Sequence, residues 1–123
     1  MLKDKLYTIE DIQISDSGIN AELKLNNEHA IFKGHFPDVP VLPGVAMMQM
    51  IKELVEVGEE QVLQISKAGN LKFLQMINPQ KVDFLKVEIS IIAKTTDIIK
   101  LKAQILNEQS ICFKMTAQLL IIN

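Results

Sequence analysis

The most restrictive feature of the sequence is the alternation of apolar and polar residues through its last third. Residues 85–91, 99–105 and 111–121 each carry an apolar side chain at every second position, with mostly polar residues between. A period of two places alternate side chains on opposite faces of a β-sheet. With turns near Thr95-Thr96-Asp97 and Asn107-Glu108-Gln109, these segments predict three long antiparallel strands.

The first half predicts further strands. Residues 6–14 and 19–25 indicate a hairpin with its turn at Asp16-Ser17-Gly18. Residues 61–67 and 71–76 are interpreted as two strands separated by a turn at Gly69-Asn70.

One helix interrupts this pattern, over residues 44 to about 57. The apolar residues Met47, Met50, Ile51 and Leu54 share one face, while Gln49, Lys52, Glu53 and Glu56 share another, where the last three predict an ordinary solvated surface. Pro43 suits the first helical position, and Pro37 and Pro40 stiffen the loop before it. The expected fold class is α+β, one domain over residues 1–123 with an antiparallel sheet wrapped around one long central helix.

Composition excludes several classes of function. The formal net charge is −2, from 13 basic and 15 acidic residues, so no concentrated positive footprint for nucleic acid is expected. No apolar run reaches the ~20 residues of a membrane helix, and the N-terminus lacks a signal peptide's apolar region, so we expect a cytoplasmic protein. The single Cys112 has no basic neighbour to activate it and is expected to be inert.

Two histidines flank the proline-rich loop. His29 and His35 have no third ligand at a suitable spacing, so neither a metal site nor a cofactor is expected. His29 is expected to hydrogen-bond to backbone at the loop entry. An unperturbed histidine side chain has a pKa of about 6.5, near operating pH, so His35 is suited to act as a general base.

The segment GHFPDVPVLPGV, residues 34–45, resembles the active-site signature of the hotdog-fold 3-hydroxyacyl-acyl carrier protein dehydratases, the FabA/FabZ-like family. The preceding HAIF run, with His29 and Phe32, is similar to relatives that act in polyene and pigment pathways. The resemblance implies a hotdog fold, an acyl carrier protein or coenzyme A thioester as substrate, and a homodimer or higher oligomer in which two subunits build each site. It also implies substrate contacts from Phe36 and Met48, with Met47, Met48 and Met50 lining or bordering an acyl tunnel.

The chain departs from that family at one position. Family dehydratases carry Glu or Asp fourteen residues after the histidine, where this chain has Gln49. A carboxamide donates hydrogen bonds but does not transfer its proton, and loss of a general acid typically lowers the rate by ~10²–10⁴-fold. Gln49 is therefore expected to position the substrate hydroxyl, or else to be a polar residue at a dimer interface.

The remaining tasks of a dehydratase can be assigned by chemistry. His35 is the candidate base, and the backbone amides of Gly44 and Val45, at a helix N-terminus, are candidates to stabilise charge on a thioester carbonyl oxygen. Gly44 has no side chain to obstruct the thioester. Glu53, Glu56 and Asp38 are not expected to replace the missing acid.

Three functions remain open. The first is a 3-hydroxyacyl thioester dehydratase with His35 and Gln49 at its centre. The second is a catalytically impaired subunit that binds an acyl thioester or acyl carrier protein. The third is a hotdog acyl thioesterase. The apolar segment 111–122 further predicts a partner molecule that covers it.

Overall fold

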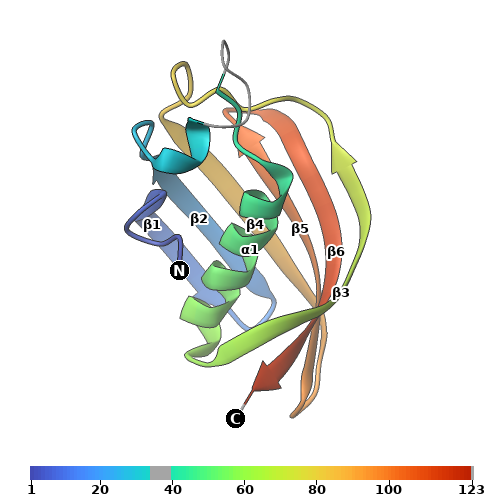
Figure 1. The fold of residues 1–123 in the computed structure, drawn as a ribbon. Helices are drawn as coiled ribbons and strands as arrows, with labels where there is room; N and C mark the ends of the chain where they lie inside the picture. Colours follow the sequence, from blue (N-terminus) through green and yellow to red (C-terminus); the bar gives the residue numbers. More distant parts are fainter. Residues whose placement is uncertain (34–39, 123) are drawn as a thin grey trace.

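The computed structural model describes residues 1–33 and 40–122, which form a curved antiparallel sheet and one long helix (Figure 1). The elements follow in the order β1 Tyr7–Ser15, β2 Gly18–Leu25, the short 3-10 turn η1 Ala30–Phe32, α1 Gly44–Glu59, β3 Val62–Phe73, β4 Phe84–Lys94, β5 Ile98–Asn107 and β6 Ser110–Ile122.

The sheet has the strand order β1-β2-β4-β5-β6-β3, and all neighbouring strands are antiparallel. Val87 lies opposite Ile105, which lies opposite Phe113, so the register brings the alternating apolar side chains to one face. The helix α1 lies across this concave face (Figure 1), where Met50 and Leu54 are fully buried. The predicted α+β arrangement, a sheet wrapped around one central helix, is confirmed.

The N-terminal hairpin and the final meander form as predicted, but the turn expected at Gly69-Asn70 is wrong. Strand β3 runs through these residues and pairs with β6 on both sides of them, with a shift in register between Gly69 and Lys72. Asn70 adopts a φ of 49°, which asparagine tolerates better than most residues. The local turn signal therefore produces an irregularity within the strand rather than its end.

The apolar side chains of strand β6 are buried within this chain, without a second molecule. It lies inside the sheet between β5 and β3, and Phe113, Met115 and Leu119 are buried in the core. The prediction of a partner over this strand therefore rested on the wrong strand. The two edge strands are β1 and β3, and on β3 the side chains of Val62, Leu71 and Phe73 keep much of their apolar surface in solvent.

Helix α1 begins at Gly44, as the predicted range had it, but Pro43 is its N-cap with extended backbone rather than its first helical residue. Its polar face also differs from the prediction. Lys52 and Glu56 form the expected pair, 3.6 Å apart, and Glu56 also accepts a hydrogen bond from the Leu63 backbone. Glu53, in contrast, is fully buried.

Candidate functional site

His29 holds the entry to the proline-rich loop. Its side chain Nδ1 accepts a hydrogen bond of 3.0 Å from the backbone N–H of Ile31, and it caps the short η1 turn. The carbonyl of His29 accepts from the Phe32 N–H, which helps place the Phe32 side chain in the core. The predicted role of His29, a hydrogen bond to backbone, is confirmed.

The predicted base and one predicted substrate contact, His35 and Phe36, lie in residues 34–39, outside the described residues. Their roles stay predictions. After this segment the chain is anchored at Leu42, which is buried and whose N–H donates 2.9 Å to the carbonyl of Ile77. That anchor sets where α1 begins.

The N-terminus of α1 has the backbone arrangement that a carbonyl site requires. The N–H groups of Ala46 and Met47 both donate to the Pro43 carbonyl, and Pro43 makes no side-chain cap. Gly44 and Val45 precede these first helical hydrogen bonds, so their N–H groups lie where a helix offers donors to a ligand. The Val45 side chain is 74% exposed.

Phe73, which sequence reasoning missed, lies directly over Gly44. A Cβ built on Gly44 would fall 2.4 Å from ring atom Cε1 of Phe73. The ring also packs against Phe113, with centroids 5.1 Å apart. This ring, on a residue that is 60% exposed, therefore occupies the space beside Gly44 that the sequence assigned to an approaching thioester. No local pattern identifies the contact, because Phe73 and Gly44 come from different elements.

The methionines of α1 divide into two groups. Met47 and Met50 are buried core residues, whereas Met48 is partly buried and packs against the core. Of the predicted tunnel residues, Met48 is thus the one with surface left for a ligand.

The carboxylate of Glu53, past the middle of α1, accepts hydrogen bonds from several polar groups. Its Oε1 accepts from the Lys3 N–H at 2.8 Å and from the Tyr7 hydroxyl at 2.9 Å. Its Oε2 accepts from the Leu2 N–H at 2.8 Å and from Nε2 of Gln49 at 2.7 Å. Four donors thereby satisfy the two oxygens of a carboxylate that has no exposed surface.

These donors control the charge of Glu53. Burial by itself raises the pKa of the Glu53 carboxyl, but hydrogen bonds from Leu2, Gln49, Tyr7 and Lys3 lower it, and the net pKa falls below its ordinary value. Burial, and then the hydrogen bond to Glu53 and its charge, raise the pKa of the Tyr7 hydroxyl. Glu53 is therefore an ionised acceptor at neutral pH and cannot serve as a proton donor.

Gln49 is oriented by this carboxylate. Because its Nε2 faces Glu53, one amide hydrogen is engaged, and within residues 1–33 and 40–122 no side chain takes up Oε1 or the second N–H. The sequence signal for the contact was the i, i+4 spacing of Gln49 and Glu53, which places both on one helix face. That spacing did not show that the face is turned into the protein.

The structure supports no further role for Cys112, the other residue considered from the sequence. Cys112 is buried, and burial raises the pKa of its thiol, in keeping with an inert cysteine. Among residues 1–33 and 40–122, no group of three His, Cys, Asp or Glu side chains is arranged to hold a metal ion. Within the same ranges, the helices are too short or too polar to cross a membrane.

Comparison with known proteins identifies the family of this chain. A family model described as ApeI-like, ApeI dehydratase, matches residues 11–116. The 3-hydroxyacyl-[acyl-carrier-protein] dehydratase FabZ of Clostridium acetobutylicum is 32% identical over 94 residues, which are 68% of this chain and 62% of that protein. The FabZ of Petrotoga mobilis is 23% identical over 107 residues, 82% of this chain and 76% of its own. The chain thus spans less than two thirds of the first of these relatives.

Solved structures share the fold. The dehydratase heterocomplex ApeI:P from Xenorhabdus doucetiae has a TM-score of 0.78 at 9% identity, covering 98% of this chain and 86% of that chain. A hypothetical thioesterase from Streptococcus pneumoniae, solved with coenzyme A, has a TM-score of 0.69 at 15% identity, covering 95% and 86%. At such low identity these structures establish the hotdog fold alone. The family model, which covers most of the sequence, shows that this chain belongs to the ApeI-like dehydratase family.

Proposed function

We propose that this chain dehydrates 3-hydroxyacyl thioesters, with a fatty-acyl or polyene acyl chain carried on acyl carrier protein or coenzyme A. The proposal rests on the family membership and on the geometry around Gln49. It makes the protein a hydro-lyase of lipid metabolism, and we place it in the cytoplasm.

The reaction needs three groups around the substrate. His35 removes the proton from C2, and the resulting negative charge moves to the thioester carbonyl oxygen, where the N–H groups of Gly44 and Val45 stabilise it. The C3–O bond then breaks, a C2–C3 double bond forms, and the departing hydroxyl takes the proton from His35 to leave as water. Gln49 holds that hydroxyl in place.

The hydrogen bond between Gln49 and Glu53 is the observation that carries this assignment. It fixes the carboxamide by one N–H, so that Oε1 and the other N–H are available to the substrate hydroxyl. Since Glu53 stays ionised, the proton returned to the hydroxyl has to come from His35. A fixed carboxamide can orient a leaving group while a single histidine carries the proton in both steps.

Access to the site requires movement of one side chain. The Phe73 ring covers Gly44, and its exposed position on the edge strand β3 lets it turn away when a thioester approaches. The same edge carries exposed Val62 and Leu71, and we propose that a second subunit pairs there. Such a subunit, in a homodimer, would lie beside the start of α1 and complete the site.

A second candidate is a subunit that binds the acyl thioester or its carrier protein without turnover. It is favoured by the carboxamide at position 49 and by the heterocomplex formed by the structural neighbour from Xenorhabdus doucetiae. In that case a partner would supply the missing acid. Thioester hydrolysis has only the shared fold in its favour.

The test is conversion of a short 3-hydroxyacyl-acyl carrier protein to its trans-2-enoyl form, followed by mass spectrometry. We expect turnover by the natural protein and none by His35→Ala. Full activity of His35→Ala would refute the assigned base. Release of free thiol without enoyl product would identify a thioesterase instead.

A further inference from the structure

The outer face of the sheet has an uneven distribution of charge. The neighbouring strands β5, β6 and β3 contain no aspartate or glutamate, yet they carry five exposed lysines: Lys67, Lys72, Lys100, Lys102 and Lys114. The register places these lysines in adjacent rows of the face opposite the helix. A chain with more acidic than basic residues overall thus gathers positive charge on one half of one surface.

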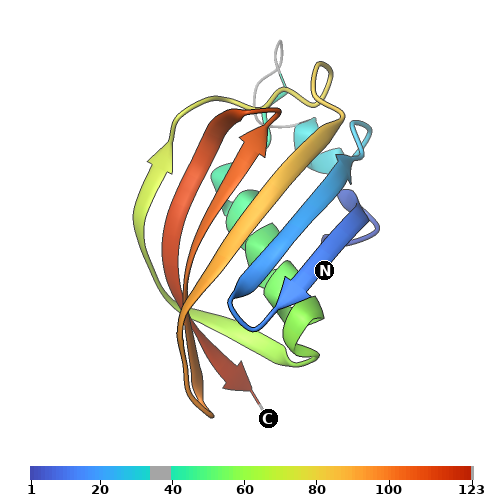
Figure 2. The same cartoon turned by 180° about the vertical axis from the view of Figure 1, so that it is seen from behind.

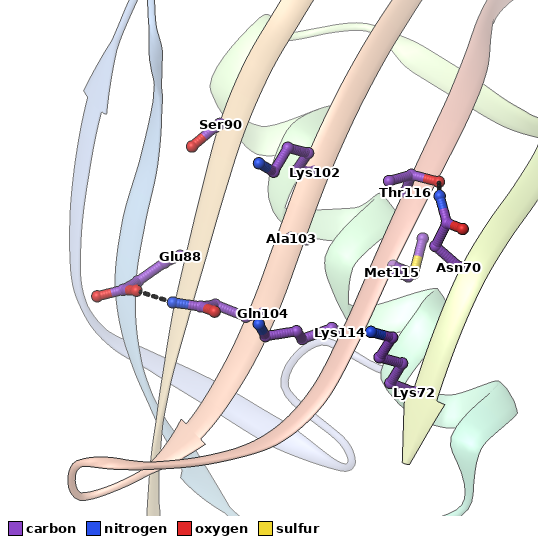
Figure 3. A pocket seen from close by; sticks show the side chains of 10 residues that line it. All are labelled: Asn70, Lys72, Glu88, Ser90, Lys102, Ala103, Gln104, Lys114, Met115 and Thr116. Atoms are coloured by element: carbon purple, nitrogen blue, oxygen red, sulfur yellow. Dashed lines mark hydrogen bonds between the residues drawn. The ribbon is translucent and has the colours of Figure 1, made fainter. Parts of the chain in front are cut away.

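A cleft of about 410 Å³ lies within this half (Figure 3). Lys72, Lys102 and Lys114 border it, together with the hydroxyls of Ser90 and Thr116. Figure 3 shows the three ammonium groups lying over the strands on the same side of the sheet. The volume falls in the range of small-molecule sites.

The polar groups of the cleft are arranged in favour of an anion. The one carboxylate on its border, Glu88, is bound by the side-chain amide of Gln104. Thr116 Oγ1 accepts 3.3 Å from Asn70 Nδ2, which leaves its own hydrogen free to donate. The cleft therefore offers three ammonium groups and two hydroxyl groups as donors, against the single negative charge of Glu88.

Lys72 and Lys114 form the most informative pair. They are direct cross-strand partners in the β3–β6 ladder. Like charges directly opposite one another destabilise a sheet, and nothing in the described residues places a carboxylate between them. An anion bound between the two ammonium groups would remove this repulsion.

We propose that this cleft is a binding site for the phosphate groups of a small-molecule ligand. Three lysines match a multiply charged anion, since lysine is a common point-charge partner of phosphate and one carboxylate would neutralise only one of them. Figure 2 shows the outer face of the sheet, with α1 behind it. Lys72, Lys102 and Lys114 lie on that outer face, so the site does not depend on the proposed dehydration.

The first experiment measures binding of pyrophosphate by calorimetry and its effect on thermal unfolding, at constant ionic strength set with potassium chloride. A ligand that binds only the folded state raises the unfolding temperature. We expect a saturable rise with pyrophosphate, and at least a tenfold loss of affinity in Lys72→Gln and in Lys114→Gln. The matched control is Lys100→Gln, on the same face but outside this cleft, which should keep its affinity within about twofold, since exposed charges further apart are largely screened.

Each readout can overturn the proposal. Equal losses of pyrophosphate affinity in Lys100→Gln and Lys114→Gln would show diffuse electrostatic attraction rather than a defined site. Citrate binding as tightly as pyrophosphate would refute the assignment to phosphate. Coenzyme A provides a second source of phosphates: binding that is lost in Lys114→Gln supports a carrier as the ligand, and no binding of either compound refutes the site.

A measurement without ligand separates this role from a structural one. Removing one charge of the cross-strand pair should raise the unfolding temperature of free Lys114→Gln above that of the natural protein. A lower unfolding temperature would mean that Lys114 stabilises the fold, and would contradict the inference that an absent anion completes the cleft.

Discussion

The first turn of α1 and its third turn differ in how their polar groups are satisfied. At the first turn, the N–H groups of Gly44 and Val45 precede the helical hydrogen bonds, and the exposed ring of Phe73 lies against Gly44. Around Glu53, four donors fill the two oxygens of a fully buried carboxylate. We propose that a ligand uses the donors of the first region, whereas the second region holds Gln49 by a hydrogen bond. The predictions below test that contrast, beginning with the largest expected effect.

Replacing Gln49 by glutamate should turn the fixed carboxamide into an acid. The new carboxyl would lie within hydrogen-bond reach of Glu53, whose other donors keep it ionised, so the pKa of the new group should be raised and it should hold its proton. We expect the rate of enoyl formation to rise by about 10²–10⁴-fold at neutral pH. Gln49→Met is the control for shape without polarity, and it should not gain activity.

The same variant separates the two proposed functions. Turnover by the natural protein, further raised in Gln49→Glu, supports a dehydratase that manages with histidine alone. Turnover by Gln49→Glu only would identify the natural protein as a binding subunit. A variant no faster than the natural protein, although that protein turns over, would show that position 49 does not face the leaving hydroxyl.

Glu53→Gln should weaken the closed network. Its new amide presents N–H to donors that previously met a carboxylate, and an unsatisfied buried polar group lowers stability by about 1–3 kcal/mol. Denaturant titration should show that loss, and turnover should fall as Gln49 loses its anchor. Glu59→Gln, which removes the surface pair of Glu59 with Lys94, should change stability by less than about 1 kcal/mol. Equal effects of the two substitutions would remove the distinction between the closed network and an ordinary surface.

The stability supplied by Glu53 should depend on pH in one direction. Its folded pKa lies below the ordinary 4.5, so below that pH the unfolded chain takes up the proton first and unfolding is favoured. The difference in unfolding free energy between the natural protein and Glu53→Gln should therefore be full above about pH 5 and shrink as the pH falls further. A difference that grew with acid would mean that the folded pKa is raised.

Gly44→Ala should have the smallest effect on stability. The added methyl group displaces the Phe73 ring, at a cost of about 1 kcal/mol that the better helix propensity of alanine partly offsets. We expect weaker thioester binding, measured by titration of an acyl carrier substrate, because the methyl group obstructs the two amides. Phe73→Ala should have the opposite effect and tighten binding, since it uncovers Gly44. Weaker binding in Phe73→Ala would show that the ring contacts the substrate rather than covering the site.

The strand pattern and the loop motif were readable from the sequence because each is a local property. Alternation over residues 85–91, 99–105 and 111–121 specifies which faces are apolar, and the motif in residues 34–45 indicated the hotdog family that the family model confirms. Gly69-Asn70 could not be read in the same way, because pairing with β6 outweighs the local turn preference.

The sequence by itself determined the fold class, the family, and the presence of a carboxamide, Gln49, at the position where the family resemblance implies an acid. Only the tertiary structure decided that Glu53 is buried, that it holds Gln49, and that Phe73 covers Gly44. The reason is physical. Glu53 meets donors from Leu2, Lys3 and Tyr7, which are about fifty residues away along the chain, and no periodicity in α1 reveals whether such donors arrive. A charged residue on a helix can be buried only if other parts of the chain supply hydrogen-bond partners. For Glu53, the packing of the N-terminal segment supplies them.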